Sequence, residues 1–175
     1  MLVKRHVNEP QWVFGYGSLI YKVDFPYLQR ETASITGWKR RFWQGSHDHR
    51  GTPEAPGRVV TLVPARGVIC KGIAYLVEPR VFEHLDHREK NGYTRHDIEV
   101  VLDDRQTAVQ GLLYVASPEN PAFLGPAPIE ELADHIASAH GPSGSNRDYL
   151  LQLADALRTL EDEDPHVLAL ESLLR

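Results

Sequence analysis

The 175-residue chain has little that would cross-link it or anchor it in a membrane. Its single cysteine, Cys70, cannot form an internal disulfide, which is consistent with a reducing compartment. No apolar stretch approaches the roughly 20 residues that a membrane-spanning helix needs. Residues 1–6 lack the apolar core of a signal peptide. We therefore expect a cytoplasmic protein that does not act at a membrane.

The chain also lacks an excess of positive charge, because its formal net charge is −5. General nucleic-acid binding needs a basic face, so we expect no nucleic-acid partner. A small anionic ligand could bind only where the protein is locally positive. The 42% hydrophobic and 25% charged content is ordinary for a soluble globular protein, and the length favours one domain with its own core.

The order of the expected elements predicts an α+β fold. Polar loops separate the first segments, and apolar residues at helical spacing appear mainly near the end of the chain. Short connections favour a mixed, mostly antiparallel sheet that closes as a small barrel, with helices concentrated in the C-terminal third. We expect one domain at residues 12–175 and a loose lead-in at residues 1–11. The expected strands are residues 12–16, 32–42, 58–63, 68–77, 93–102 and 108–115, with a turn at 64–67, and the expected helices are 79–90, 129–139, one capped by Asn146 and one opened by Pro165.

Residues 15–19 read Gly-Tyr-Gly-Ser-Leu and directly follow an apolar strand pattern; we call them the glycine loop. Two glycines around an aromatic allow backbone N–H groups to converge on one small space, which suits an anion. The loop lacks the third glycine of a dinucleotide fingerprint and the lysine of a phosphate loop. Ser18 is not flanked as a nucleophile elbow requires. A simple turn after an edge strand fits the spacing as well.

A second dense cluster lies at residues 85–93, where acids, bases and a histidine end the predicted helix at 79–90. A carboxylate near a helix C-terminus is electrostatically disfavoured. If Glu89 is also buried, its pKa should be raised, and it could accept a proton near neutral pH. The alternative is a solvated helix end with mixed charges.

Other reactive residue types give weaker signals. The four histidines at 47, 49, 84 and 87 have permissive spacing, but no cysteine or carboxylate pattern completes a metal site, so none is expected. Cys70 lies in an apolar strand and is interpreted as a core residue. Arg40 and Arg41 stand among aromatics, as in some nucleic-acid surfaces. The acidity of the chain instead favours a strand in which Arg41, or Arg58 further along, serves an anionic ligand.

Several longer motifs occur in a fixed order from Trp12 to the last helix. Together they resemble the ChaC family, the glutathione-specific gamma-glutamylcyclotransferases, and most closely its short second subtype. The resemblance rests on residues 13–20 (VFGYGSLI), 41–46 (RFWQGS), 48–51 (DHRG), 56–62 (PGRVVTL), 85–86 (LD), 88–90 (REK), 92–93 (GY), 124–128 (LGPAP) and 141–144 (GPSG).

This resemblance implies the gamma-glutamylcyclotransferase-like fold and cleavage of glutathione into 5-oxoproline and cysteinylglycine, without a metal or other cofactor. It places the proton-transferring glutamate on Glu89. Asn91 departs from relatives that often carry a second glycine there, but asparagine tolerates a left-handed backbone. The residues expected to bind substrate are Val13, Phe14, Gly15, Tyr16, Gly17, Ser18 and Leu19, with Arg41 and Tyr149 as further positioning candidates.

The implied chemistry agrees with the residues. The α-amine of a γ-glutamyl group can attack its own γ-carbonyl, so the enzyme needs no nucleophile but must fold the substrate and move protons. Two other functions remain open at this point. One is a cyclotransferase acting on other γ-glutamyl amines or peptides, and the other is a non-catalytic regulator linked to cation transport. The sequence does not predict an oligomeric state.

Overall fold

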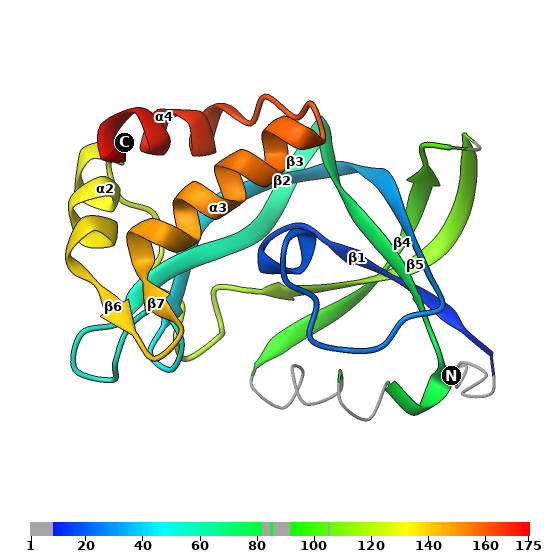
Figure 1. The fold of residues 1–175 in the computed structure, drawn as a ribbon, viewed down its shortest axis with the longest axis horizontal. Coiled ribbons are helices and arrows are strands. Elements are labelled where there is room, and N and C mark those ends of the chain that lie inside the picture. The colour runs from blue at the N-terminus through cyan, green and yellow to red at the C-terminus, as the bar shows by residue number, and fades with distance from the viewer. Residues whose placement is uncertain (1–8, 82–84, 86–91, 105) are drawn as a thin grey trace.

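The computed structural model describes residues 9–81, 85, 92–104 and 106–175. Its five long strands close into a barrel in the order β1-β3-β2-β4-β5 (Figure 1). All neighbours are antiparallel except β1 and β5, which run parallel where Trp12 faces Gly111 and Val13 faces Leu112. The predicted mixed, mostly antiparallel barrel is therefore confirmed. The strands are β1 (Gln11–Gly15), β2 (Gln29–Ser46), β3 (Gly57–Val77), β4 (Tyr93–Leu102) and β5 (Thr107–Ala116).

The turn predicted at residues 64–67 is wrong, because β3 continues through it. Both halves of β3 pair with β2, on one side at Thr36 with Ile69 and on the other at Trp38 with Pro64. Residues 65–68 therefore form a bulge opposite Gly37, and the chain does not reverse. Gly37 and Gly67 both have positive φ, 98° and 77°, which lets the two strands bend together at this point.

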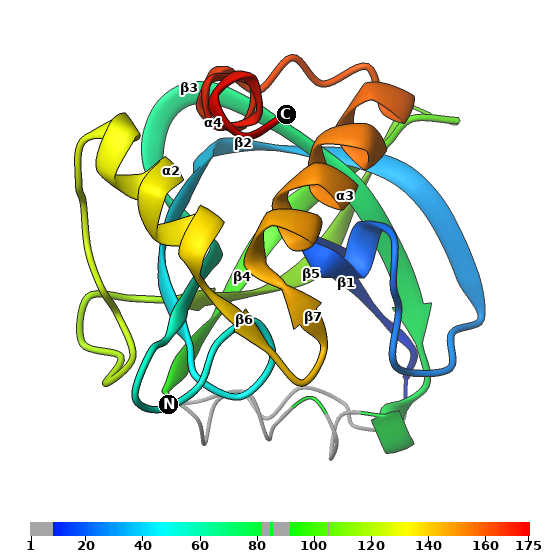
Figure 2. The same cartoon turned by 60° about the vertical axis from the view of Figure 1, so that its left-hand side comes forward.

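Three helices lie together on one side of the barrel (Figures 1 and 2). They are α2 (Ile129–Ser138), α3 (Asn146–Thr159) and α4 (Pro165–Leu174), so the predicted concentration of helices near the C-terminus is confirmed. A two-stranded ribbon, β6 (His140–Gly141) with β7 (Gly144–Ser145), joins α2 to α3. The predicted helix at 79–90 opens as a 3-10 turn, η2 (Pro79–Val81), and Leu85 is helical; its other residues lie outside the described part of the chain. No helix among the described residues is long and apolar enough to cross a membrane.

The residue that caps α3 is Ser145 and not Asn146 as predicted. The Ser145 side chain accepts a hydrogen bond from the N–H of Asp148, as a helix cap does. The buried amide of Asn146 is engaged elsewhere, because it accepts from the Arg58 N–H at 2.7 Å and donates to the Arg58 carbonyl at 2.8 Å. This pair of bonds fixes the start of α3 against β3.

The apolar residues form two cores. The inner core fills the barrel with side chains from all five strands, among them Phe14, Leu62 and Leu113. The outer core lies between the barrel and the helices and includes Val13 and Phe42. Because neighbouring residues of a strand face opposite sides, β1 contributes Phe14 to the inner core and Val13 to the outer core.

Candidate active site

The glycine loop leaves β1 at Gly15 and enters a short 3-10 turn, η1 (Ser18–Ile20), which lies beside α3 (Figure 1). The loop is packed too tightly for side chains at its glycines. A Cβ on Gly15 would lie 2.8 Å from the Leu19 Cβ, and one on Gly17 would lie 2.8 Å from Val60 Cγ1 and 3.3 Å from the Tyr149 hydroxyl. The two glycines are therefore required by close contacts and not only by a turn.

Arg40 fixes the orientation of the glycine loop. Its Nε donates to the carbonyl of Tyr16 at 2.7 Å. In a trans peptide the N–H points away from the carbonyl, so the N–H of Gly17 is directed away from Arg40. The N–H groups of Ser18 and Leu19 open η1 and have no acceptor within it. Up to three backbone donors therefore lie in one short segment, as the anion-binding interpretation requires.

Arg40 is itself fully satisfied, although its side chain is only 1% exposed. Its Nη1 lies 2.9 Å from Asp162 Oδ2 and 3.3 Å from Asp164 Oδ2, both between α3 and α4. Its Nη2 donates to the carbonyl of Lys71. Burial lowers the pKa of Arg40, but the nearby negative groups outweigh it and raise the pKa above its usual value. Arg40 thus connects β2, β3 and the segment between α3 and α4 to the glycine loop.

Tyr149 lies beside the loop, as its place among the candidate residues requires. It projects from α3, and its buried hydroxyl accepts a hydrogen bond from the Val60 N–H at 3.2 Å. Burial raises its pKa well above the ordinary value, and the neighbouring hydroxyls of Tyr21, Tyr93 and Tyr16 act on it too. The Tyr149 hydroxyl is therefore neutral and keeps its own proton available to donate.

The other predicted substrate-binding residues play varied parts. The side chains of Val13 and Phe14 are buried in the two cores, so only their backbone could meet a ligand. The Tyr16 hydroxyl donates to the Tyr114 carbonyl at 2.7 Å, and the Leu19 carbonyl accepts from Tyr75. Ser18 is exposed.

Arg41 follows Arg40 on β2. Its Nη1 donates to the carbonyl of Arg40 at 2.6 Å, and its charge acts on His166 at the start of α4. Among the described residues no hydrogen bond or ion pair joins Arg41 to the glycine loop, so its role in binding stays a prediction. Arg58 donates to the carbonyls of Phe42 and Gly125, at 3.0 and 2.8 Å, and so serves the fold.

Glu89 lies outside the described residues, as do Asp86 and Asn91. The nearby described residues on either side, Leu85 and Tyr93, both belong to or contact the outer core. Leu85 is buried in the outer core, and Tyr93 packs against the same core, which also contains Tyr149.

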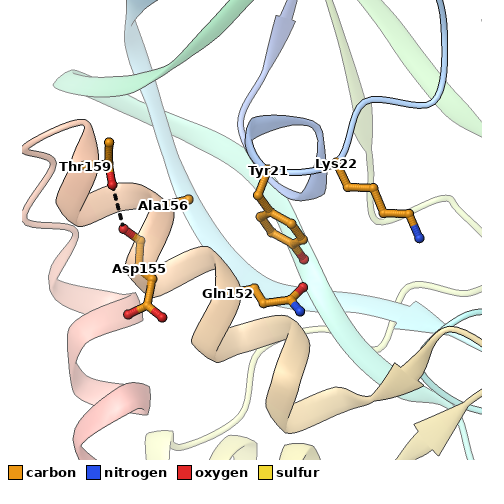
Figure 3. A pocket seen from close by; sticks show the side chains of 6 residues that line it. All are labelled: Tyr21, Lys22, Gln152, Asp155, Ala156 and Thr159. Atoms are coloured by element: carbon orange, nitrogen blue, oxygen red, sulfur yellow. Dashed lines mark hydrogen bonds between the residues drawn. The ribbon is translucent and has the colours of Figure 1, made fainter.

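A surface hollow of about 520 Å³ lies between α3 and the segment after η1 (Figure 3). Tyr21 forms one wall, and its ring also packs edge-on against Tyr149 with centroids 6.4 Å apart. The Tyr21 hydroxyl is buried and has no hydrogen-bond partner among the described residues. Tyr21 thus separates the hollow from the buried tyrosines next to the glycine loop. The residues that line the hollow are Tyr21, Lys22, Gln152, Asp155, Ala156 and Thr159.

Cys70 is a buried core residue, as predicted. Burial raises the pKa of its thiol to about 11, so the thiol is protonated at neutral pH. Within the described ranges no three side chains of histidine, cysteine, aspartate or glutamate gather as a metal site would require.

Sequence reasoning missed Arg40, Tyr21 and Arg50. Arg40 was noticed only as part of an aromatic stretch, and the alternation of β2 could have separated it from Arg41. Tyr21 follows the glycine loop directly, but nothing in the sequence places its ring against α3. Arg50 belongs to the motif at residues 48–51, whose position became clear only in the fold.

The fold resembles that of a solved enzyme. A crystal structure of the gamma-glutamyl cyclotransferase specific to glutathione from yeast matches with a TM-score of 0.83 and 34% identity, over 95% of this chain and 96% of that one. The barrel, the glycine loop and the C-terminal helices thus form the fold of gamma-glutamylcyclotransferases.

Sequence comparisons then give the family. The family model described as ChaC-like protein matches residues 11–175. Gamma-glutamylcyclotransferase 2-3 of Arabidopsis thaliana is 44% identical, covering 94% of this chain and 88% of the relative. Glutathione-specific gamma-glutamylcyclotransferase 1 of Danio rerio is 42% identical, covering 93% and 88%. The chain belongs to the ChaC-like family. Its subtype stays a prediction, because relatives numbered 2-3 and 1 match almost equally well.

Proposed function

We propose that this protein cleaves glutathione by intramolecular cyclisation of the γ-glutamyl group and releases 5-oxoproline and cysteinylglycine. Relatives and a solved structure named as glutathione-specific support the substrate. The observation that carries the proposal is the glycine loop, in which Arg40 takes the Tyr16 carbonyl and turns the Gly17 N–H the other way. Backbone donors next to the protonated Tyr149 suit the head of a γ-glutamyl group.

The reaction forms one C–N bond and breaks another. The α-amine, once it has lost a proton, attacks the γ-carbonyl carbon. Its nitrogen loses a second proton as the five-membered lactam closes. The bond from that carbon to the cysteinyl nitrogen then breaks, and this nitrogen takes up a proton as it leaves. Because both reacting groups belong to one molecule, correct folding of the substrate can lower the barrier by up to about 7–11 kcal/mol.

In this proposal Glu89 moves the proton. It takes a proton from the α-ammonium and returns it to the departing cysteinyl nitrogen. A described neighbour supports this role, since Tyr93, four positions beyond Glu89, packs against the core that contains Tyr149. Cyclisation in this form needs neither a metal nor another cofactor.

The glycine loop has the binding role. The backbone N–H groups of residues 15–19 hold either the α-carboxylate or the oxyanion that develops on the γ-carbonyl oxygen. Tyr16, Tyr149 and Arg41 position the substrate. We also propose a cytoplasmic location, on the ground that the single cysteine suits a reducing compartment.

The direct test measures 5-oxoproline released from glutathione by the purified protein. Glu89→Gln should bind glutathione normally and lose turnover by about 10²–10⁴-fold, the usual contribution of a general acid or base. Glu99→Gln is the matched control, because Glu99 is an exposed glutamate on β4. Near-wild-type turnover by Glu89→Gln would contradict the role. Turnover of γ-glutamyl-alanine or γ-glutamyl-lysine in preference to glutathione would contradict the substrate.

A further inference from the structure

Two glycine-containing motifs, at residues 48–51 and 141–144, meet away from the glycine loop, where the loop after β2 lies against β6 and β7 (Figures 1 and 2). The Ser143 N–H donates to the His49 carbonyl at 2.9 Å, and their side chains lie 3.0 Å apart. A Cβ on Gly141 would lie 2.5 Å from the His49 carbonyl oxygen. The glycines therefore allow the two backbones to touch.

This contact places Arg50 in the interior, where it is only 8% exposed. Its Nη1 donates to the Ser145 carbonyl at 3.1 Å, and a Cβ on Gly144 would lie 2.9 Å from the same nitrogen. Among the described residues no carboxylate pairs with Arg50. A buried guanidinium without a counter-ion is unfavourable unless something else supplies negative charge.

The surroundings of Arg50 have the composition of a carboxylate site. Its Cζ lies 5.6 Å from the centre of the Tyr149 ring, over the face of that ring. The buried Tyr21 hydroxyl, which has no hydrogen-bond partner among the described residues, lies close enough for the charge of Arg50 to act on it. Gly17 approaches the hydroxyl end of the same Tyr149 ring. One tyrosine thus separates Arg50, which has no carboxylate partner in the described part of the chain, from the backbone donors of the glycine loop.

We propose that Arg50, with the hydroxyl of Tyr21, binds the α-carboxylate of the γ-glutamyl group. This inference rests on the proposed function and assigns the carboxylate that the glycine loop alone left unassigned. A planar guanidinium can hold a carboxylate through two parallel hydrogen bonds and so fix its orientation. Because the α-carbon carries both the carboxylate and the amine, this grip also aims the attacking nitrogen. The N–H groups of the glycine loop then serve the γ-carbonyl oxygen.

The carboxylate of the glycyl residue is the other anionic group of glutathione, and the structure favours the α-carboxylate. Arg50 and the glycine loop contact the same tyrosine, so their ligands must belong to one compact group. The glycyl carboxylate is separated from the reacting carbonyl by the whole cysteinylglycine leaving group.

The test compares three substrates by kcat/KM, measured as release of the free amine of the cysteinyl product. They are glutathione, 4-aminobutyryl-cysteinylglycine, which lacks the α-carboxylate but keeps the cyclising amine, and the glycinamide of glutathione, which lacks the glycyl carboxylate. For wild type we expect glutathione to exceed the first analogue by about 100-fold or more, as for loss of a buried charge-assisted pair. The glycinamide should stay close to glutathione.

Arg50→Met should lower kcat/KM for glutathione and for the glycinamide by about 100-fold, and leave the α-decarboxy analogue almost unchanged. Arg66→Met, the same change at an exposed arginine on β3, is the matched control. An equal loss on all three substrates would mean that Arg50 only braces the Ser145 carbonyl. If wild type instead prefers glutathione to the glycinamide, and Arg50→Met loses only that preference, Arg50 binds the glycyl carboxylate.

If Arg50→Met does not fold, Arg50→Lys is measured in the same way. It keeps the charge but loses the planar fork, and it should lose about tenfold in preference for the α-carboxylate. An unchanged preference would overturn the proposal. Wild-type protein that releases no 5-oxoproline from glutathione would instead refute the proposed function, so the two failures are distinguishable.

Discussion

Arg40 and Arg50 are two buried arginines that differ in what they bind: Arg40 contacts the glycine loop itself, and Arg50 contacts Tyr149 beside it. Arg40 contacts two aspartates and two backbone carbonyls. Among the described residues, the Arg50 side chain contacts one carbonyl and the face of one ring. Both are buried cations, yet only the first has its charge neutralised by described residues. Burial of a charge is therefore not informative alone; its list of partners tells whether it belongs to the scaffold or to a binding site.

The largest expected effect tests Arg40, the arginine whose charge is neutralised. Arg40→Met should lower the free energy of unfolding by about 3–5 kcal/mol, because it leaves Asp162 and Asp164 without their cation and removes a donor from the Tyr16 carbonyl. Urea denaturation measures the loss. Arg66→Met is the control, because Arg66 is exposed in the β3 bulge and should change stability by less than about 0.5 kcal/mol. Equal effects of the two variants would contradict a scaffold role for Arg40.

A second test addresses how α4 packs against β2, the strand that carries Arg40. The ring of His166 accepts a hydrogen bond from the Phe42 N–H at 3.0 Å. Burial, and then the charges of Arg41 and Lys39, lower its pKa from 6.5 to about 4. Between pH 4 and 6.5 the unfolded chain binds more protons than the folded protein. The contribution of His166 to the free energy of unfolding is therefore present above pH 6.5 and is lost as the pH falls towards 4. The loss should reach about 3 kcal/mol.

Urea denaturation at several pH values between 4 and 7 measures this dependence. Subtracting the curve of His166→Gln, which has no titrating ring, isolates the contribution of His166 from that of the carboxylates. A difference between the two proteins that stays constant with pH would show that the ring does not titrate in this range.

On the binding side, Gly17→Val should raise the dissociation constant for glutathione at least tenfold, or about 1.4 kcal/mol. Its Cβ would meet Val60 and the Tyr149 hydroxyl in the space next to the backbone donors. Calorimetry in the Glu89→Gln background avoids turnover, and Gly17→Ala should give an intermediate value. Unchanged affinity in both variants would mean that the ligand lies elsewhere.

The smallest expected effect separates function from stability. Tyr21→Phe removes a buried hydroxyl that has no hydrogen-bond partner among the described residues, so stability should stay the same or rise by up to about 1 kcal/mol. The KM for glutathione should rise about three- to tenfold, because the hydroxyl no longer reaches the substrate carboxylate. Tyr27→Phe, at an exposed tyrosine, is the control. A clear loss of stability would show that this hydroxyl supports the fold.

Local patterns predicted the fold wherever local chemistry decides the structure. The strand at residues 93–102 has the predicted bounds, because Gly92 precedes its alternating pattern and two aspartates follow it. Pro165 opens α4 as expected, with Asp164 as its cap. The short segment at residues 103–106 joins β4 to β5 as an antiparallel pair, in keeping with the predicted mostly antiparallel sheet.

Long-range contacts decided the rest. The Pro-Ala-Arg-Gly segment has the composition of a turn, but pairing of both flanks with β2 makes it a bulge. Ser145 and Asn146 are equally good caps, and the backbone of Arg58 takes the amide of Asn146. Arg40 and Arg41 are adjacent cations between aromatics. The alternation of a strand puts them on opposite faces, but only the finished barrel shows that Arg40 is the buried one. Arg50 becomes meaningful only when residues 141–144 pack against its loop.

The parallel pairing of β1 with β5 has a consequence for how the protein is made. Trp12 pairs with Leu76 on one side and with Gly111 on the other, so the strand that leads into the glycine loop is enclosed by segments much further along the chain. Such distant pairings slow folding, because a long loop must close before they form. During synthesis the glycine loop leaves the ribosome early, but it can acquire its final shape only after β5 has emerged. The first functional segment to be translated is thus among the last to be built.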